Sequence, residues 1–458
     1  MPSSVQDQVF LKIGPVLLGI LLALILGLSR YLFPVDDDFC FFSDVRHYES
    51  ASEYLAFWYQ NWAGRWLATL LRYFYYAESS LTTPIWLGPL LLSSAIGGAF
   101  LISTAIYGVK AFSSGIGFFI AVVFLLLMSQ PRYQLFWAPA GFDYTVGYVV
   151  LGAFLASCRG AITGAGGVQG YAFLSGALLF GILATGFSEL QALIPPAVAF
   201  GLLLLAKDNR LRWGFLTISC SVAASLNLLA PGAQVRKAEL GLTVGAGDVL
   251  RDMALYGSRF FIITYLPLML ITLIPMFREK VIDLGEMANE ALTSRGCWLI
   301  VTLVVLFPVF TFGLISWAQG AVATGRTTNL ALLLCLATWP IIFFKAKEVI
   351  KRTFPINRLL RNSLGILGIV SVLAVNLPYY LRDLTLGRAE AALKNFYQND
   401  SSIKDSELGQ AVIWEPLNEP PKSIPTNLVS EDNKYWVNRC IARAYSVKTV
   451  QIIDPMKD

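Results

Sequence analysis

The sequence contains little charge and almost no histidine. Asp, Glu, Lys and Arg make up only 14% of its 458 residues, whereas 56% are hydrophobic. A soluble protein carries about 25% charged residues, so the composition indicates an integral membrane protein. The single histidine, His47, excludes a metal centre built from several histidines. The six cysteines form neither a CxxC motif nor a Cys/His cluster, which argues against a structural zinc site or a redox motif.

Long apolar stretches recur along most of the chain. Each is about 17–22 residues long, which is enough for a helix to cross about 30 Å of hydrocarbon. We therefore predict an all-α polytopic membrane protein with about eleven transmembrane helices. The predicted spans are residues 13–33, 84–108, 112–129, 143–158, 170–187, 190–206, 213–230, 260–277, 297–316, 329–345 and 363–380. No small-residue cleavage site follows the first run, so we predict a span there and not a cleaved signal peptide.

The short basic loops give an orientation for these spans. The loops at 207–213, 278–280 and 345–362 fall on one side when the spans alternate, and the positive-inside rule makes that side cytoplasmic. The opposite side carries the longer segments, which are 34–83, 130–142, 187–189, 231–259, 317–328 and the tail. Residues 34–83 have apolar and aromatic residues at helical spacing, which predicts helices lying along the membrane interface. The net charge of +5 is spread over the loops and indicates no nucleic-acid partner.

The composition changes after Arg388. We predict a transmembrane domain at 1–388 and a small extracytoplasmic segment at 389–458, of α/β character, with strand-like pieces at 411–416 and 446–453. About 70 residues are few for an independent core, so this segment is expected to pack on the loops of the same face. Cys40 and Cys440 then lie outside, where a disulfide can persist, although two free thiols are equally compatible with the sequence.

Three consecutive aspartates, Asp36, Asp37 and Asp38, follow the first apolar run. At the C-terminal end of the first predicted span, acids are slightly disfavoured by the helix dipole, which argues against simple caps. One interpretation is a solvated acidic loop. The other is a carboxylate pair in a cleft, in which one acid with a raised pKa acts as a base and its neighbour orients it or binds a divalent cation such as Mg or Mn.

Aromatic residues accompany charged residues in two further segments. In "NWAGRW", Trp62 and Trp66 lie four residues apart with Arg65 between them. In residues 131–148, Trp137, Asp143 and Tyr144 precede or enter a span. Both patterns fit an interfacial aromatic belt with snorkelling polar groups. Both also fit the entry of a sugar or anionic ligand, because aromatic faces suit sugar C–H surfaces and arginine suits phosphate.

Glu189, Arg236 and Arg326 are the remaining candidates. Glu189 lies at the tip of a tight hairpin between two apolar runs, Arg236 follows a Pro-Gly helix end, and Arg326 directly precedes a span. A polar turn, a solvated helix end and an ordinary cap explain each one separately. However, acids and arginines from several loops fall on one predicted face, which indicates an active site there. The spans hold almost no charge, which argues against an ion-coupled transporter.

The ordered set of motifs resembles the GT-C superfamily of integral-membrane glycosyltransferases, and more closely a poorly characterised bacterial branch of it. The matching motifs are "DDDF" with Asp37 and Asp38, "NWAGRW" with Trp62, Gly64 and Arg65, "TGFSE" with Glu189, "APGAQVR" with Pro231, Gly232 and Arg236, and "KYWVNR" with Trp436 and Asn438. They cover nearly the whole chain in order. Ala233 departs from the pattern, which has asparagine at that position.

The resemblance implies a multi-pass protein of a bacterial plasma (inner) membrane with its active site on the extracytoplasmic face. The donor would be a polyprenyl-phosphate-linked sugar held among membrane lipids, and the acceptor a glycan or lipid-linked glycan. On this basis Asp37 is the expected base, and Asp38 its orienting neighbour or an optional metal ligand. Glu189 is the expected second acid.

The other roles follow from residue type. Arg65, Arg236 and Arg326 are the expected donor-phosphate ligands, and Trp62, Trp137, Asp143 and Tyr144 the expected sugar or acceptor contacts. Three alternatives stay open at this point. They are an O-antigen ligase or polymerase that uses a pyrophosphate-linked donor, a glycolipid flippase, and a membrane scaffold without catalytic activity.

Overall fold

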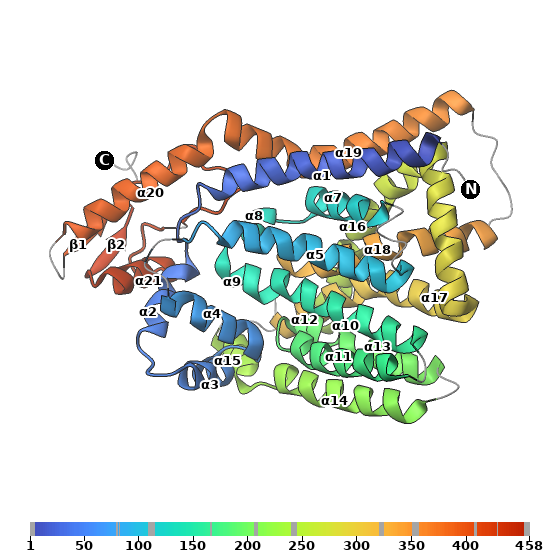
Figure 1. Ribbon diagram of the computed structural model, residues 1–458. Helices are drawn as coiled ribbons and strands as arrows, with labels where there is room; N and C mark the ends of the chain where they lie inside the picture. The colour runs from blue at the N-terminus through green and yellow to red at the C-terminus, as the bar shows by residue number, and fades with distance from the viewer. Residues whose placement is uncertain are drawn as a thin grey trace.

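The protein is described from a computed structural model, which covers residues 5–78, 81, 83–108, 115–164, 167–205, 209–239, 245–319, 325–349, 357–406, 410–427 and 429–452. It is predominantly helical. The membrane-region helices are α1 (Val5–Ser29), α5 (Leu87–Tyr107), α7 (Ile116–Leu127), α10 (Val146–Thr163), α11 (Val168–Thr185), α13 (Ile194–Leu205), α14 (Arg210–Leu228), α16 (Ala246–Ile271), α17 (Pro275–Gln319), α18 (Gly325–Val349) and α19 (Arg358–Thr385). Most of them run side by side as one bundle (Figure 1).

Eight helices in the described residues are long and apolar enough to cross a membrane, and three further apolar helices are shorter. The predicted all-α polytopic fold is thus confirmed, whereas the predicted number of eleven spans is not. The outer faces fit this class. On α14, Leu211, Phe215, Ile218 and Val222 recur every three or four residues and are 60–91% exposed. An exposed apolar stripe of this kind is expected where a helix faces lipid.

The innermost of the eight is α18, with 78% of its apolar window buried inside the protein. Its side chains Leu333, Cys335 and Ala337 are fully buried. Because α18 starts at Gly325, Arg326 lies in its first turn, where its side chain is half-buried against the rings of Trp137 and Tyr133.

The segment between two predicted spans differs from expectation. Residues 278–280 were predicted to lie in a short basic loop, but they belong to α17, which is continuous over 45 residues from Pro275 to Gln319. The reason is an apolar face at helical spacing, with Val281, Leu284 and Ala288 buried at 2% exposure or less. That face packs along α18 and extends the helix beyond the apolar window.

The predicted helices within residues 34–83 are confirmed. They are α2 (Asp37–Val45), α3 (Ala51–Asn61) and α4 (Trp66–Glu78). Short elements from later in the chain lie nearby, namely α8 (Pro131–Leu135), α9 (Ala138–Ala140), the π-helical turn η1 (Gly141–Thr145), α12 (Glu189–Ala192) and α15 (Pro231–Glu239). Helices α2, α3, α4 and α15 gather at one end of the bundle (Figure 1). The predicted loop at 231–259 is mostly helical, because α15 covers its first part and α16 its last part. Residues 240–244 of this loop lie outside the described part.

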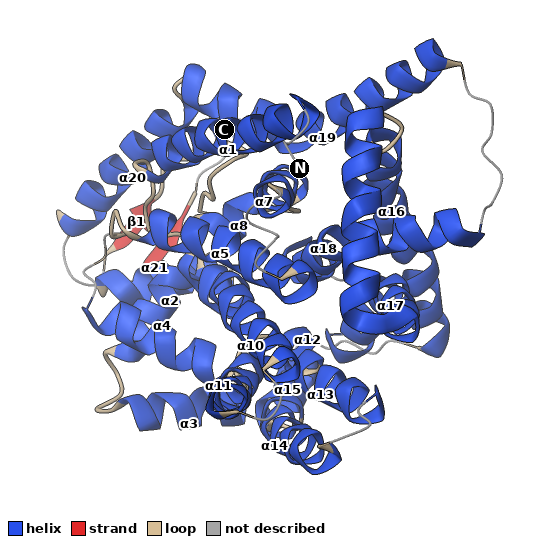
Figure 2. Cartoon of the chain, turned by 45° about the vertical axis from the view of Figure 1, so that its right-hand side comes forward, coloured by secondary structure: helices blue, strands red, loops and turns tan. Residues whose placement is uncertain are grey.

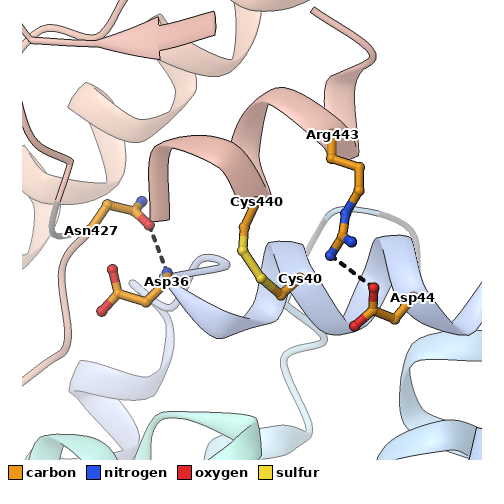
Figure 3. The surroundings of a disulfide bond; sticks show 6 residues. All are labelled: Asp36, Cys40, Asp44, Asn427, Cys440 and Arg443. Atoms are coloured by element: carbon orange, nitrogen blue, oxygen red, sulfur yellow. Dashed lines mark hydrogen bonds and ion pairs between the residues drawn. A yellow bond between two sulfur atoms is a disulfide. The ribbon is translucent and has the colours of Figure 1, made fainter. Parts of the chain in front are cut away.

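The C-terminal segment contains α20 (Arg388–Lys404), β1 (Ala411–Ile413), α21 (Trp436–Tyr445) and β2 (Thr449–Gln451). The two strands pair in parallel, with Val412 opposite Val450, and form the short sheet visible beside α21 in Figure 2. Strands β1 and β2 lie within the two predicted strand-like pieces, 411–416 and 446–453. Residue 453, the last of the second piece, lies outside the described residues. The segment packs on α2 through α21, and a Cys40–Cys440 disulfide joins the two helices (Figure 3).

Candidate functional site

The aspartate triplet lies at the N-terminus of α2, where the helix dipole favours acids, and not at the C-terminal end of the first span as predicted, because α1 already ends at Ser29. Asp36 has φ 46° and ψ −108°, a combination that side chains disfavour and that costs about 1–3 kcal/mol. Its amide donates to Asn427 Oδ1 at 2.9 Å, so the C-terminal segment holds the strained residue (Figure 3). Strain of this kind persists only where surrounding contacts enforce it, and it often marks a functional site.

Asp38 is the anchored member of the triplet. Its carboxylate is 7% exposed, accepts the Val35 amide at 2.8 Å, and accepts a short hydrogen bond from the Tyr76 hydroxyl. Burial raises the pKa of Asp38 to about 7, although both hydrogen bonds favour its charged form. With each oxygen already engaged, Asp38 is suited to fixing the start of α2.

Asp37 is the available member of the triplet. It is half-buried, and within the described residues its carboxylate makes no hydrogen bond and no ion pair. Burial raises the pKa of Asp37 to about 6, against the opposing charges of Arg326 and then Arg72, while Asp143 adds a smaller upward contribution. An unpaired carboxylate with this pKa can accept a proton near neutral pH.

Arg326 is a cation without a carboxylate partner in the described part of the chain. Its guanidinium lies over the rings of Trp137 at 5.3 Å and Tyr133 at 6.0 Å. The Nε atom is buried and donates no hydrogen bond to any residue that the structure describes. Trp137 also donates from Nε1 to the Val35 carbonyl at 3.3 Å, which ties this aromatic wall to the aspartate segment. Arg326 can therefore still bind an anion.

Glu189 joins two arginines from distant parts of the sequence. Its carboxylate accepts Arg65 Nη2 at 2.8 Å and Nε at 3.1 Å, and Arg236 Nη2 at 3.3 Å. Arg65 Nη1 also reaches Asp143 Oδ2 at 2.5 Å, and Arg72 Nε lies 3.7 Å from Asp143 Oδ1. These arginine side chains are 10% exposed or less, so the ion pairs are largely shielded from water. The guanidinium groups of Arg65, Arg72 and Arg236 carry three positive charges, and the carboxylates of Asp143 and Glu189 carry two negative charges. The network therefore has a net charge of one positive unit.

Two glycines allow the segments carrying these arginines to cross. A Cβ atom on Gly64 would lie 2.1 Å from the Asn227 carbonyl oxygen, and one on Gly232 would lie 2.2 Å from the Trp62 amide nitrogen. No other residue type fits at such backbone contacts. The crossing places Arg65 and Arg236 on the same carboxylate. The adjacent Asn227 holds the Glu189 loop by donating to the carbonyls of Thr185 at 2.6 Å and Phe187 at 3.1 Å.

A π-helical turn presents Asp143 and Tyr144. In η1 the backbone bulges before α10 begins, and such bulges occur frequently at functional sites. Tyr144 then lies 5.6 Å from the Arg65 guanidinium, and Trp62 lies 5.9 Å from that of Arg236. All the predicted aromatic residues, Trp62, Trp137 and Tyr144, thus contact a predicted arginine.

The structure therefore divides the predicted site residues between two connected groups. The first group is the ion-pair network of Arg65, Asp143, Glu189 and Arg236, with Trp62 and Tyr144 against it. The second is Asp37 and Asp38 with Arg326 and Trp137. Arg72 connects the groups because it pairs with Asp143 and acts on Asp37.

Some residues of the site were not predicted. Arg72 lies on α4, seven residues after Arg65, which directly precedes that helix, and this near-helical spacing could have identified it. Tyr76, Asn227 and Asn427 act through tertiary contacts that leave no pattern in the sequence. From the tail motif, Asn438 braces the turn at Ser430 with hydrogen bonds of 2.7 and 2.9 Å, whereas Trp436 is 37% exposed.

The residues do not fit the divalent cation that the sequence allowed. Within the described ranges no group of three His, Cys, Asp or Glu side chains is placed to hold a metal. Both oxygens of Asp38, the predicted optional ligand, already accept hydrogen bonds. Positive side chains here can instead offset negative charge on a ligand.

The chain matches no protein-family model, no characterised protein and no solved structure.

Proposed function

We propose that this protein is a membrane glycosyltransferase that moves a sugar from a polyprenyl-phosphate donor to a glycan or lipid-linked glycan. The observation that carries the proposal is that Asp37, a half-buried acid without an ion pair among the described residues, lies within the electrostatic influence of Arg326, a cation that also forms no ion pair there. A proton acceptor beside an anion-binding group is what sugar transfer from a phosphate requires. The resemblance to GT-C enzymes supports the same assignment.

In the proposed reaction Asp37 accepts the proton of an acceptor hydroxyl. The hydroxyl oxygen then forms a bond to the anomeric carbon, and the bond between that carbon and the phosphate oxygen breaks. The polyprenyl phosphate leaves with the electron pair, and the configuration at the anomeric carbon inverts. Asp38 is hydrogen-bonded at both oxygens and keeps the start of α2 in place.

The arginines take different roles in this scheme. Arg326 binds the phosphate and stabilises the charge that develops on it, because its guanidinium lies over aromatic rings and forms no ion pair in the described residues. Arg236 makes a single 3.3 Å contact with Glu189 and retains donors for the same purpose. Arg65 uses Nε, Nη1 and Nη2 on Asp143 and Glu189, so we assign it to holding the site together.

Glu189 and the aromatic residues complete the proposed site. Glu189 is the second acid and orients Arg65 and Arg236. Asp143, Tyr144, Trp62 and Trp137 form the walls for the sugars. The three shorter apolar helices count with the eight longer ones to give eleven spans, and the site end of the bundle faces away from the cytoplasm of a bacterial plasma membrane.

Transfer from labelled donors tests the proposal. Membranes containing the full chain are incubated with a panel of radiolabelled polyprenyl-phosphate hexoses and pentoses, and label is followed into water-soluble and lipid-linked glycan. We expect transfer from at least one donor in the parent. Transfer only from pyrophosphate-linked glycans would make the protein ligase-like. Movement of a donor between leaflets without any transfer would make it a flippase, and either result would overturn the proposal.

A further inference from the structure

The C-terminal segment contains a pocket beside the aspartate triplet. Three aromatic residues line it, with Phe396 stacked on Phe33 at 5.0 Å and 6.4 Å from Trp414 between ring centroids. Pro416, Leu417 and Pro420 also line the pocket. No charged side chain lines the pocket among the described residues. A pocket of this composition is unsuited to a phosphate and suits an uncharged ligand with an apolar face.

Several polar groups in the pocket retain hydrogen-bonding capacity among the described residues. Trp414 lines the pocket, and its indole Nε1 donates no hydrogen bond within the described part of the protein. The Thr426 hydroxyl likewise has no partner there. Asn427 Nδ2 makes one long contact of 3.4 Å, to the Pro34 carbonyl. The indole N–H of Trp414, the Thr426 hydroxyl and the Asn427 amide are therefore available to hydrogen-bond a ligand that carries acceptor oxygens.

Asn427 places the pocket next to the proposed base. Its amide lines the pocket, and its Oδ1 accepts the Asp36 amide at 2.9 Å. Figure 3 shows this side chain pointing at Asp36, one residue before Asp37. The Cys40–Cys440 disulfide and the 2.8 Å Asp44–Arg443 ion pair hold α2 against the same segment. A ligand in the pocket is therefore held in a fixed relation to Asp37.

We propose that this pocket binds a neutral sugar ring of the acceptor glycan. Apolar C–H faces of the ring would pack on the aromatic and proline walls, and its hydroxyls would accept from Trp414 and Asn427 and pair with Thr426. The assignment of the sugar to the acceptor rests on the proposed transferase function. Binding of the sugar itself does not depend on that function, so the two can fail separately.

Saturation-transfer NMR on the full chain in lipid nanodiscs tests the binding. The probes are the methyl glycosides of glucose, galactose, mannose, rhamnose and N-acetylglucosamine. At least one should receive saturation from the parent protein. Thr426→Trp, which fills the pocket, should weaken that binding at least tenfold, and Thr426→Val should weaken it less. Thr449→Val, outside the pocket lining, is the matched control and should bind as the parent does.

Transfer kinetics then separate the two proposals. Thr426→Trp should raise the KM for the acceptor at least tenfold while the KM for the donor stays unchanged. If the parent transfers sugar but no probe binds, or if Thr426→Trp alters neither binding nor the acceptor KM, the pocket assignment is wrong and the transferase stands. If the probes bind in the predicted way but no donor supports transfer, the pocket is a sugar site and the transferase proposal is wrong.

Discussion

Arg65 and Glu189, 124 residues apart in the sequence, form a two-point ion pair in which Nη2 and Nε approach the same carboxylate at 2.8–3.1 Å. Arg236 adds a third contact to Glu189, and Asp143 holds the other side of Arg65. Three separate segments of the chain are thus joined by one carboxylate. The Arg65–Glu189 ion pair is shielded from water. Removing either partner would leave the other charge buried without compensation, so the stability of the site depends on both residues.

Glu189→Gln should destabilise the protein and abolish transfer. The amide keeps the size of the side chain but leaves Arg65 and Arg236 with excess positive charge, and breaking a buried pair costs about 3–5 kcal/mol. The midpoint of unfolding in detergent measures the effect. Glu390→Gln changes an exposed acid on α20 and should leave the midpoint where it is. Equal midpoints for the two variants would contradict a structural role for Glu189.

The glycine crossing gives a steric prediction. Gly64→Ala and Gly232→Ala each place a methyl group within 2.2 Å of backbone atoms of the opposite segment, so each should cost about 3 kcal/mol or more. Gly214→Ala is the matched control, since no atom lies within 4 Å of its added Cβ on α14. The control should be neutral or slightly stabilising, as expected for Gly to Ala in a helix. Folded yield and unfolding midpoint distinguish the variants, and normal stability of either crossing variant would refute this contact.

The pH dependence of transfer should report Asp37. Since a base acts only when deprotonated, kcat/KM should rise with pH, with an apparent pKa of about 6, and level off above it. Arg326 is the largest of the charges that lower this pKa, so Arg326→Gln should move the rise to higher pH and reduce the plateau about 100-fold or more. A profile for Arg326→Gln with an unshifted midpoint would mean that the titrating group is not Asp37.

The disulfide predicts a thiol count. Cys40 is joined to Cys440, whereas Cys158, Cys220, Cys297 and Cys335 are thiols, so alkylation of the denatured, unreduced protein should modify four cysteines, and six after reduction. Cys40→Ser should lower stability by about 2–4 kcal/mol and loosen the hold of the C-terminal segment on α2. Mass spectrometry counts the modified thiols. Six modified cysteines before reduction would show that Cys40 and Cys440 are not joined in the protein.

Several features of the fold could be predicted from local sequence, and others could not. Apolar length predicted a polytopic membrane protein, and helical spacing predicted α2, α3 and α4 in the first long loop. The prediction of a short basic loop at 278–280 is wrong, because buried positions such as Val281 and Leu284 continue α17 through this basic stretch. Hydropathy measures only composition, and it does not reveal whether a polar segment packs against a neighbouring helix.

The candidate site shows the same division. Residue type and order identified Asp37, Arg65, Glu189 and Arg236 as members of one face, and the structure brings the last three into contact. Which arginines are neutralised and which stay available depends on tertiary geometry. Arg65 is saturated by carboxylates, whereas Arg326 is not, and no spacing rule separates the two. The hold of Asn427 on Asp36 spans 391 residues and had no sequence signal.

Transfer by Asp37→Asn is the most direct test of the central claim that Asp37 is the catalytic base. The amide keeps the shape of the side chain but cannot accept the proton, and a general base contributes about 10²–10⁴-fold in rate. Asp283→Asn, an exposed acid on α17, serves as the matched control. We expect transfer of label from the active polyprenyl-phosphate donor to fall at least about 100-fold in Asp37→Asn, while its unfolding stays parent-like and the Asp283→Asn control stays fully active. Parent-like transfer by a correctly folded Asp37→Asn protein would contradict it.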